Sequence, residues 1–316
     1  MTLGTKKLSN KFKKFLKGDL SYLFLSFSKS ILYNFPMPNN MPGTRIPLQG
    51  TINTRDLGGY TTKYGRKIKY KRLIRTDFLG NITPADIQYI QDELHPVYEV
   101  DMRCEDEIHA APNKEIPGVT LLNYPIQEAH KKEKLVETKG PHFNIKDKGI
   151  RSTVEYLFRM DVNGDLTYAF EKVYRNMVLP YGQKNYEAFL RLCQKNKEGC
   201  ILFHCADGKD RSGLAAALLL LMLGVDKETV IEDYLKSNEN TKVKGERREK
   251  YLREEAHIED ENIINSIKMV AGVRRNWIEA AFDEMTKIAG SVDNFIKNNL
   301  HFSDEDIKEL QDNYLE

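Results

Sequence analysis

The sequence lacks any uncharged apolar run near the ~20 residues that a membrane-spanning helix needs, since its best stretch, Leu20 to Ser28, stops at Lys29. We therefore do not expect an integral membrane protein. The 316 residues include only 11 prolines and 20 glycines, and 41% of them are apolar. This composition excludes disorder or a fibre as the main state and predicts a globular protein with a sizeable core.

An excess of either charge is also missing, because 48 Lys and Arg residues stand against 46 Asp and Glu residues. A near-neutral chain lacks the broad positive surface that binds a phosphate backbone, so we expect no nucleic-acid partner. Its four cysteines form neither a C-x-x-C pair nor a small disulfide framework; they are Cys104, Cys193, Cys200 and Cys205. Free thiols in a reducing, cytoplasmic compartment are the expectation.

The first 35 residues differ from the rest, with seven lysines and one acid, Asp19. Their apolar residues fall on one half of a helical wheel and most lysines on the other, which predicts a basic amphipathic helix. This helix either packs on its own domain or makes peripheral contact with an anionic membrane or a partner. Secretion is a further alternative, although no A-x-A-like cleavage site follows. A proline-rich linker completes the predicted N-terminal region, residues 1–45.

Residues 46–316 alternate short apolar runs with helical periodicity. Two segments predict strands and two predict helices: Val97–Met102 and Val119–Tyr124, then Pro84–Glu93 and Tyr186–Lys195. Strands separated by helices favour an α/β domain with a central, largely parallel sheet flanked by helices.

Two segments depart from this alternation. Residues 127–165 are lysine-rich and hold few apolar positions, which predicts an inserted lid or a passive surface excursion. The stretch from Ile258 to Glu316 is helical in pattern, with Ser303 as an N-cap. We expect the latter helices to wrap the core.

Residues 200–224 carry the strongest chemical signal: a short apolar run, the polar loop HCADGKDR, and the apolar stretch SGLAAALLLLMLG. A loop between a strand and a helix aims backbone N–H groups and the positive end of the helix dipole at its centre, so phosphate is the natural ligand. A thiol in that field has a pKa below its usual value of about 8.5. Cys205 is therefore the expected nucleophile.

The other loop residues suit the same task. Arg211 can meet two phosphate oxygens bidentately, and His204 is expected to orient or polarise the cysteine from behind. Gly208 lets the loop curl, and Ser212 can hydrogen-bond the sulfur. The expected phosphate-binding positions are Ala206, Asp207, Gly208, Lys209 and Ser212.

The segment HCADGKDRSG resembles the signature of cysteine-dependent protein-tyrosine phosphatases, and specifically of a bacterial branch with an HC-x-x-GKDR loop that includes phosphoinositide-active members. Further segments follow the family's order: Asn53–Tyr60, Arg75–Asp77, Val100–Arg103 with Glu107, Asp233–Leu235 with Ser237, and Gly290–Val292. The resemblance implies a phosphatase with a phosphocysteine intermediate, without metal or other cofactor. It implies phosphotyrosine as substrate, with phosphoserine, phosphothreonine or phosphoinositides as further candidates, and it nominates Asp210 as general acid. Asp207 stands where relatives have a small neutral residue.

Several alternatives stay open at this point. Buried ion pairs are the favoured interpretation of six residues near strand ends: Arg55, Asp56, Arg75, Asp77, Asp101 and Arg103. Asp56 could instead border the site, and it is the second candidate for the acid. Lys209 either reads neighbouring phosphates of an inositol headgroup or pairs with Asp207 or Asp210.

Tyr234 and Ser237 are expected to pack within a helix. The alternative function is a catalytically weak phosphate-binding or docking module, against which the intact Cys205 and Arg211 argue. A rhodanese-like sulfur transferase does not account for the KDRSG run that opens a helix.

Overall fold

The structure is a computed structural model that describes residues 41–128, 146, 150 and 166–316. Within these residues one sheet has the strand order β1-β2-β5-β3-β4. Its strands are β1 (Arg55–Asp56), β2 (Leu73–Thr76), β3 (Pro96–Asp101), β4 (Thr120–Asn123) and β5 (Cys200–His204). The last four run parallel and β1 is antiparallel to β2, which confirms the predicted largely parallel sheet.

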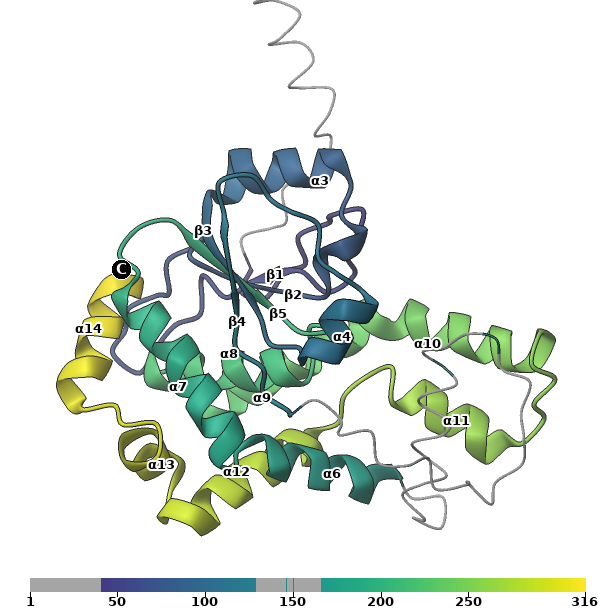
Figure 1. The fold of residues 1–316 in the computed structure, drawn as a ribbon. Coiled ribbons are helices and arrows are strands. Elements are labelled where there is room, and N and C mark those ends of the chain that lie inside the picture. The colour runs from purple at the N-terminus through teal and green to yellow at the C-terminus, as the bar shows by residue number, and fades with distance from the viewer. Residues whose placement is uncertain (1–40, 129–145, 147–149, 151–165) are drawn as a thin grey trace, which may run out of the picture. The chain divides into compact units, whose positions relative to one another are not determined.

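Helices cover both faces of this sheet (Figure 1). On one face, α3 (Pro84–Tyr89) and the π-helical turn Ile90–Leu94 pack where Leu202 points, and on the other α7 (Pro180–Lys195) and α8 (Arg211–Met222) pack where Phe203 points. Successive side chains of a strand alternate between faces, so the central strand β5 is buried along its whole length. Its continuous apolar run follows from this double burial.

The helix α8 lies at the centre of the core. Eleven of its twelve residues are buried, as expected for a helix that is apolar on all sides. Its first residue, Arg211, directly follows the loop after β5, so the predicted strand, loop and helix are confirmed.

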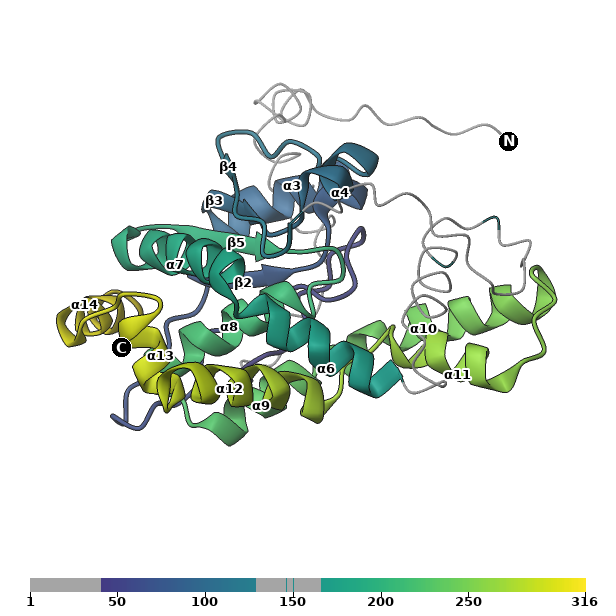
Figure 2. The same ribbon diagram turned by 60° about the horizontal axis from the view of Figure 1, so that its bottom comes forward.

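The remaining helices surround this core; they are α4 (Glu105–Ala110), α6 (Leu166–Met177), α9 (Lys227–Leu235), α10 (Ser237–Glu254), α11 (Glu261–Met269), α12 (Arg275–Ala289), α13 (Val292–Asn298) and α14 (Asp304–Tyr314). A short 3₁₀ turn covers Leu79–Asn81. Phe170 and Trp277 stack at 4.5 Å and join α6 to α12. The helices α10 and α11 pair beside the sheet domain and have a small apolar cluster of their own (Figure 2).

The C-terminal helices and their cap are confirmed. Ser303 accepts the N–H of Asp306, whose carboxylate accepts the N–H of Ser303 in return, so the two residues form a capping box at the start of α14. Two other predictions, the basic helix of residues 1–35 and most of the lid at 127–165, lie outside the described residues. No helix of the described part is long and apolar enough to cross a bilayer.

Candidate active site

The loop between β5 and α8 forms a ring of backbone amides. The carbonyls of three consecutive residues accept hydrogen bonds from outside the loop: Ala206 from Phe78 N–H (3.2 Å), Asp207 from Asn53 Nδ2 (3.2 Å), and Gly208 from Asn53 Nδ2 (3.0 Å) and Arg75 Nη2 (2.9 Å). In a trans peptide the N–H points opposite to the C=O, so the N–H groups that follow these carbonyls turn to the inner side of the loop. This is an arrangement that binds anions.

Gly208 is required for this curvature. Its φ is +65°, and a Cβ there would lie 2.6 Å from the carbonyl oxygen of Thr76. Only glycine adopts this conformation without strain and fits against β2.

Cys205 lies at the start of the loop, and its side chain is buried. Its Sγ lies 3.4 Å from the hydroxyl of Ser212, as the sequence predicts. Burial alone raises the pKa of this thiol, but the charge of Arg211 and the Ser212 hydrogen bond outweigh it, and the pKa falls below its usual value. Burial raises the pKa of the other three cysteines, all of them free, so Cys205 is the one favoured as a thiolate.

Arg211 is held in place by Glu107 from the first turn of α4. Two parallel hydrogen bonds of 2.5 and 2.8 Å join the guanidinium to the carboxylate. Burial acts to raise the pKa of Glu107, but Arg211 outweighs it and lowers this pKa to about 2. The sequence placed Glu107 only within the family resemblance and gave it no role, and the structure shows that it orients the arginine.

His204 lies beneath the loop. Its Nδ1 is 3.1 Å from the carbonyl oxygen of Cys205, and its Nε2 is 3.2 Å from Glu99 Oε1. Burial acts to lower the pKa of the imidazole, but the Glu99 hydrogen bond and the charge of Asp101 raise it above its usual value. The raised pKa of the imidazole behind Cys205 acts in the direction that favours a thiolate.

Asp210 and Lys209 form an ion pair in which the lysine is buried and the carboxylate is partly exposed. The Lys209 Nζ contacts both carboxylate oxygens, at 2.9 and 2.8 Å, and Lys209 is only 2% exposed. Tyr174 of α6 donates a third hydrogen bond to Asp210 Oδ1, at 2.7 Å. Of the two interpretations of Lys209, the geometry therefore favours pairing with Asp210 over contact with a substrate headgroup.

Asp207 turns outward and pairs with Lys244 of α10. Burial acts to raise the pKa of this carboxyl, but Lys244, Lys209 and Arg248 lower it to about 2. The extra carboxylate of the loop is thus ionised and has a cation beside it. Sequence reasoning missed Lys244, since it lies on another helix and no spacing relates it to the loop.

A buried network of arginines supports the loop from below. Arg55 and Arg75 both bind the carboxylate of Asp233, at 2.7 and 2.8 Å, and Arg103 binds Asp101 at 2.7 Å. The predicted ion pairs are thus confirmed for Arg55, Arg75, Asp101 and Arg103, whereas the carboxylates of Asp56 and Asp77 accept backbone N–H groups instead. Ser237 belongs to the same buried network, because its hydroxyl accepts a hydrogen bond from Arg55.

The structure does not bring Asp56 to the loop. Its carboxylate accepts the N–H groups of Gly58 (2.8 Å) and Lys71 (2.7 Å). Among the groups that feel its charge is Cys200, at the end of β5 opposite to Cys205. Burial raises the pKa of Asp56 to about 6, and the sheet pairs Asp56 with Ile74, two residues before Thr76, which pairs with His204 beside the loop. Asp77, by contrast, lies near the loop. Its carboxylate accepts hydrogen bonds from the N–H groups of Ile52 and Asn53.

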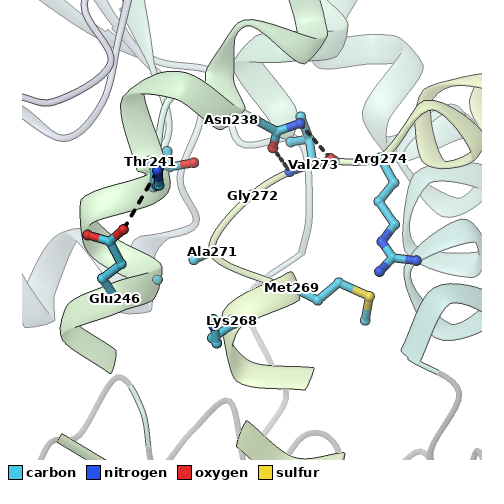
Figure 3. A pocket seen from close by; sticks show the side chains of 11 residues that line it. Asn238, Thr241, Glu246, Lys268, Met269, Ala271, Gly272, Val273 and Arg274 are labelled. Atoms are coloured by element: carbon cyan, nitrogen blue, oxygen red, sulfur yellow. Dashed lines mark hydrogen bonds and ion pairs between the residues drawn. The ribbon is translucent and has the colours of Figure 1, made fainter. Parts of the chain in front are cut away.

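A pocket of about 350 Å³ opens on the other side of α10, between this helix, α11 and the segment before α12 (Figure 3). Asn238 closes one end by exchanging two hydrogen bonds with the backbone of Val273. None of the residues that line it belongs to the loop of Cys205. The pocket is thus separate from the candidate active site.

Comparisons with known proteins agree with this geometry. The chain matches the tyrosine phosphatase family over residues 46–316. It is 26% identical over 265 residues to a Cupriavidus necator protein named as a tyrosine-protein phosphatase, covering 83% of this chain and 85% of that one.

Two shorter matches point the same way. A triple specificity protein phosphatase of Mycobacterium tuberculosis is 28% identical over 31% of this chain and 38% of its own. A tyrosine-protein phosphatase of Nostoc commune is 36% identical over 18% and 19% of the two chains. With the family match covering most of its length, this chain belongs to the tyrosine phosphatase family and is a phosphoric monoester hydrolase.

Proposed function

We propose that the protein hydrolyses phosphotyrosine through a phosphocysteine intermediate on Cys205. The observation that carries this proposal is the assembly of one loop: a buried thiol of lowered pKa, inward backbone N–H groups, and Arg211 fixed by Glu107. The loop amides and Arg211 bind the three non-bridging oxygens of the phosphoryl group.

The reaction has two steps. In the first, the Cys205 thiolate forms an S–P bond as the P–O bond to the leaving group breaks, and Asp210 gives its proton to the leaving oxygen. In the second, a water oxygen attacks phosphorus, the S–P bond breaks, and Asp210 takes a proton from the water. The hydroxyl of Ser212 stabilises the sulfur as it leaves.

The assignment of the acid to Asp210 rests on position. Its side chain is 22% exposed, and its charge acts on both Cys205 and Arg211. The competing carboxylates have other partners: Glu107 binds Arg211, Asp207 binds Lys244, and Asp77 accepts two backbone N–H groups.

Phosphotyrosine comes first among the substrates because the structure supplies no headgroup reader at Lys209, which is buried against Asp210. Phosphoserine, phosphothreonine and phosphoinositides form the wider range of candidate substrates. The mycobacterial relative is named a triple specificity phosphatase, which supports testing this wider range for the present chain.

The test is a substrate panel run with wild type and Cys205→Ser. We expect the wild type to hydrolyse phosphotyrosine peptides best, and the variant to lose turnover on every substrate while it still binds phosphate. Cys193→Ser is the matched control, because Cys193 is buried on α7, outside the loop, and its thiol pKa is raised. Binding of phosphate by the wild type without turnover would instead favour a docking module.

A further inference from the structure

Two buried tyrosines form a chain that ends on Asp210. Tyr234 of α9 donates a hydrogen bond to the hydroxyl oxygen of Tyr174 (2.6 Å), and Tyr174 of α6 donates to Asp210 Oδ1 (2.7 Å). Tyr174 is 0% and Tyr234 is 1% exposed, and their rings pack edge to face. Water therefore does not compete for these hydroxyls. The Tyr174 hydroxyl that donates to Asp210 is held by two helices outside the loop, α6 and α9.

The hydrogen bonds divide the two carboxylate oxygens unequally. Among the residues that the structure describes, Oδ1 accepts from both Tyr174 and Lys209, whereas Oδ2 accepts from Lys209 alone. A carboxyl oxygen with fewer donors keeps a lone pair free for a proton. Oδ2 is accordingly the oxygen that can carry the proton to a leaving group.

From this geometry we propose that Tyr174 is a positioning residue for the proton transfer by Asp210, supported from behind by Tyr234. The inference rests on the proposed function, since it assigns a role within that reaction. In the first step the Tyr174 hydroxyl keeps Oδ1 turned away from the leaving group, so that the proton on Oδ2 is transferred. In the second step the same contact holds Oδ2 ready to accept the proton of water.

The charged and titratable groups around Asp210 come from the loop and four helices and are Lys209, Cys205, Arg211 of α8, Tyr174 of α6, Tyr186 of α7 and Tyr234 of α9. Burial and the charge of Asp210 raise the pKa of Tyr174 well above its usual value, so Tyr174 stays a hydrogen donor across the working pH range. Loss of its hydroxyl leaves the carboxylate with one donor fewer and thus favours the protonated acid.

The experiment compares Tyr174→Phe with Tyr314→Phe. The control also loses one buried hydroxyl. Tyr314 lies on α14, away from the loop, and its hydroxyl donates a hydrogen bond to the carbonyl of Cys193 at 3.0 Å. For Tyr174→Phe we expect kcat to fall about tenfold with phenyl phosphate, a poor leaving group, and less than about twofold with 2,4-dinitrophenyl phosphate, whose leaving group needs no proton. The alkaline limb of its pH profile should move to higher pH by about 0.5 to 1.

Equal losses on both substrates, an unmoved alkaline limb, or the same behaviour in Tyr314→Phe would overturn the inference. If Tyr174→Phe does not fold, Tyr234→Phe replaces it. We then expect the same dependence of kcat on the leaving group and the same shift of the alkaline limb, both smaller. Cys205→Ser separates the two proposals, because retained turnover in that variant refutes the phosphocysteine route itself. If Cys205→Ser loses turnover but Tyr174→Phe loses kcat equally on both substrates, only the role of Tyr174 is refuted.

Discussion

The ion pair between Asp207 and Lys244 offers a direct test of electrostatics at the phosphate loop. The pair places one negative and one positive charge beside the anion site, and single substitutions remove them one at a time. Lys244→Met leaves the loop with an unpaired carboxylate, and Asp207→Asn leaves it with an unpaired cation. The double variant restores neutrality without the pair.

For a separation taken as roughly 8 Å, Coulomb's law sets the size of both effects. One charge at roughly 8 Å from a bound phosphate contributes about 2 kcal/mol at an effective dielectric constant of about 20, and counter-ions reduce this to about 1 kcal/mol. Phosphate should therefore bind three- to tenfold more weakly to Lys244→Met and more tightly to Asp207→Asn by a similar factor, as estimates of that order.

The same pair affects stability. Folding lowers the pKa of Asp207 from 3.8 to about 2, which corresponds to about 2 kcal/mol. Because the folded pKa is the lower one, this stabilisation is complete above pH of about 5 and is lost as the pH falls through about 2. Lys244→Met should lower the free energy of unfolding by part of this amount at pH 7, because Lys209 and Arg248 also lower the pKa of Asp207, and by little at pH 2.

The assay is the inhibition constant of phosphate against an aryl phosphate substrate, for wild type and the three variants, at low and high salt. Lys242→Met is the matched control, since this lysine lies on the same helix but is 76% exposed. The reasoning fails if Asp207→Asn weakens phosphate binding, or if the double variant behaves like Lys244→Met instead of like the wild type.

Three further predictions use other features. Gly208→Ala should cost about 2 kcal/mol in urea unfolding and abolish turnover, because its φ of +65° and the nearby Thr76 carbonyl exclude a Cβ; an active, stable variant would contradict this account. Hydrogen peroxide should inactivate the enzyme reversibly, with protection by phosphate or vanadate, and indifference to these ligands would point to a cysteine other than Cys205. Deletion of residues 1–35 should spare activity on soluble substrates and reduce binding to anionic vesicles, most at low salt; a truncated protein that fails to fold would show that this segment is structural.

The sheet and the loop were predictable because their signals are local. The apolar run of β5, the loop and the apolar helix α8 are contiguous in the sequence, and each pattern reports its own burial. The thiol, glycine and arginine that this chemistry needs within one loop therefore lie in a single stretch of the sequence. Element ends differed by one residue at α8, expected from Ser212 and found from Arg211, and by six at α7, expected from Tyr186 and found from Pro180.

The partners of the loop were not predictable, because they come from helices whose placement depends on the whole fold. Glu107 reaches Arg211 from α4, Tyr174 reaches Asp210 from α6, and Lys244 reaches Asp207 from α10. No spacing rule connects such residues to the loop. Their own segments read as ordinary amphipathic or charged helices.

Lys209 shows how a distant partner decides a local question. In the sequence it stands between two carboxylates, Asp207 and Asp210, and could pair with either or with a substrate. The structure settles the choice through α10: Lys244 neutralises Asp207, so Lys209 is left to bind both oxygens of Asp210. Two of the three N–H donors of Lys209 bind this carboxylate and the side chain is only 2% exposed, so a second phosphate of a substrate does not reach it while the pair is intact. Burial of the lysine without that carboxylate would cost several kcal/mol. A preference for multiply phosphorylated substrates would therefore have to come from residues other than Lys209.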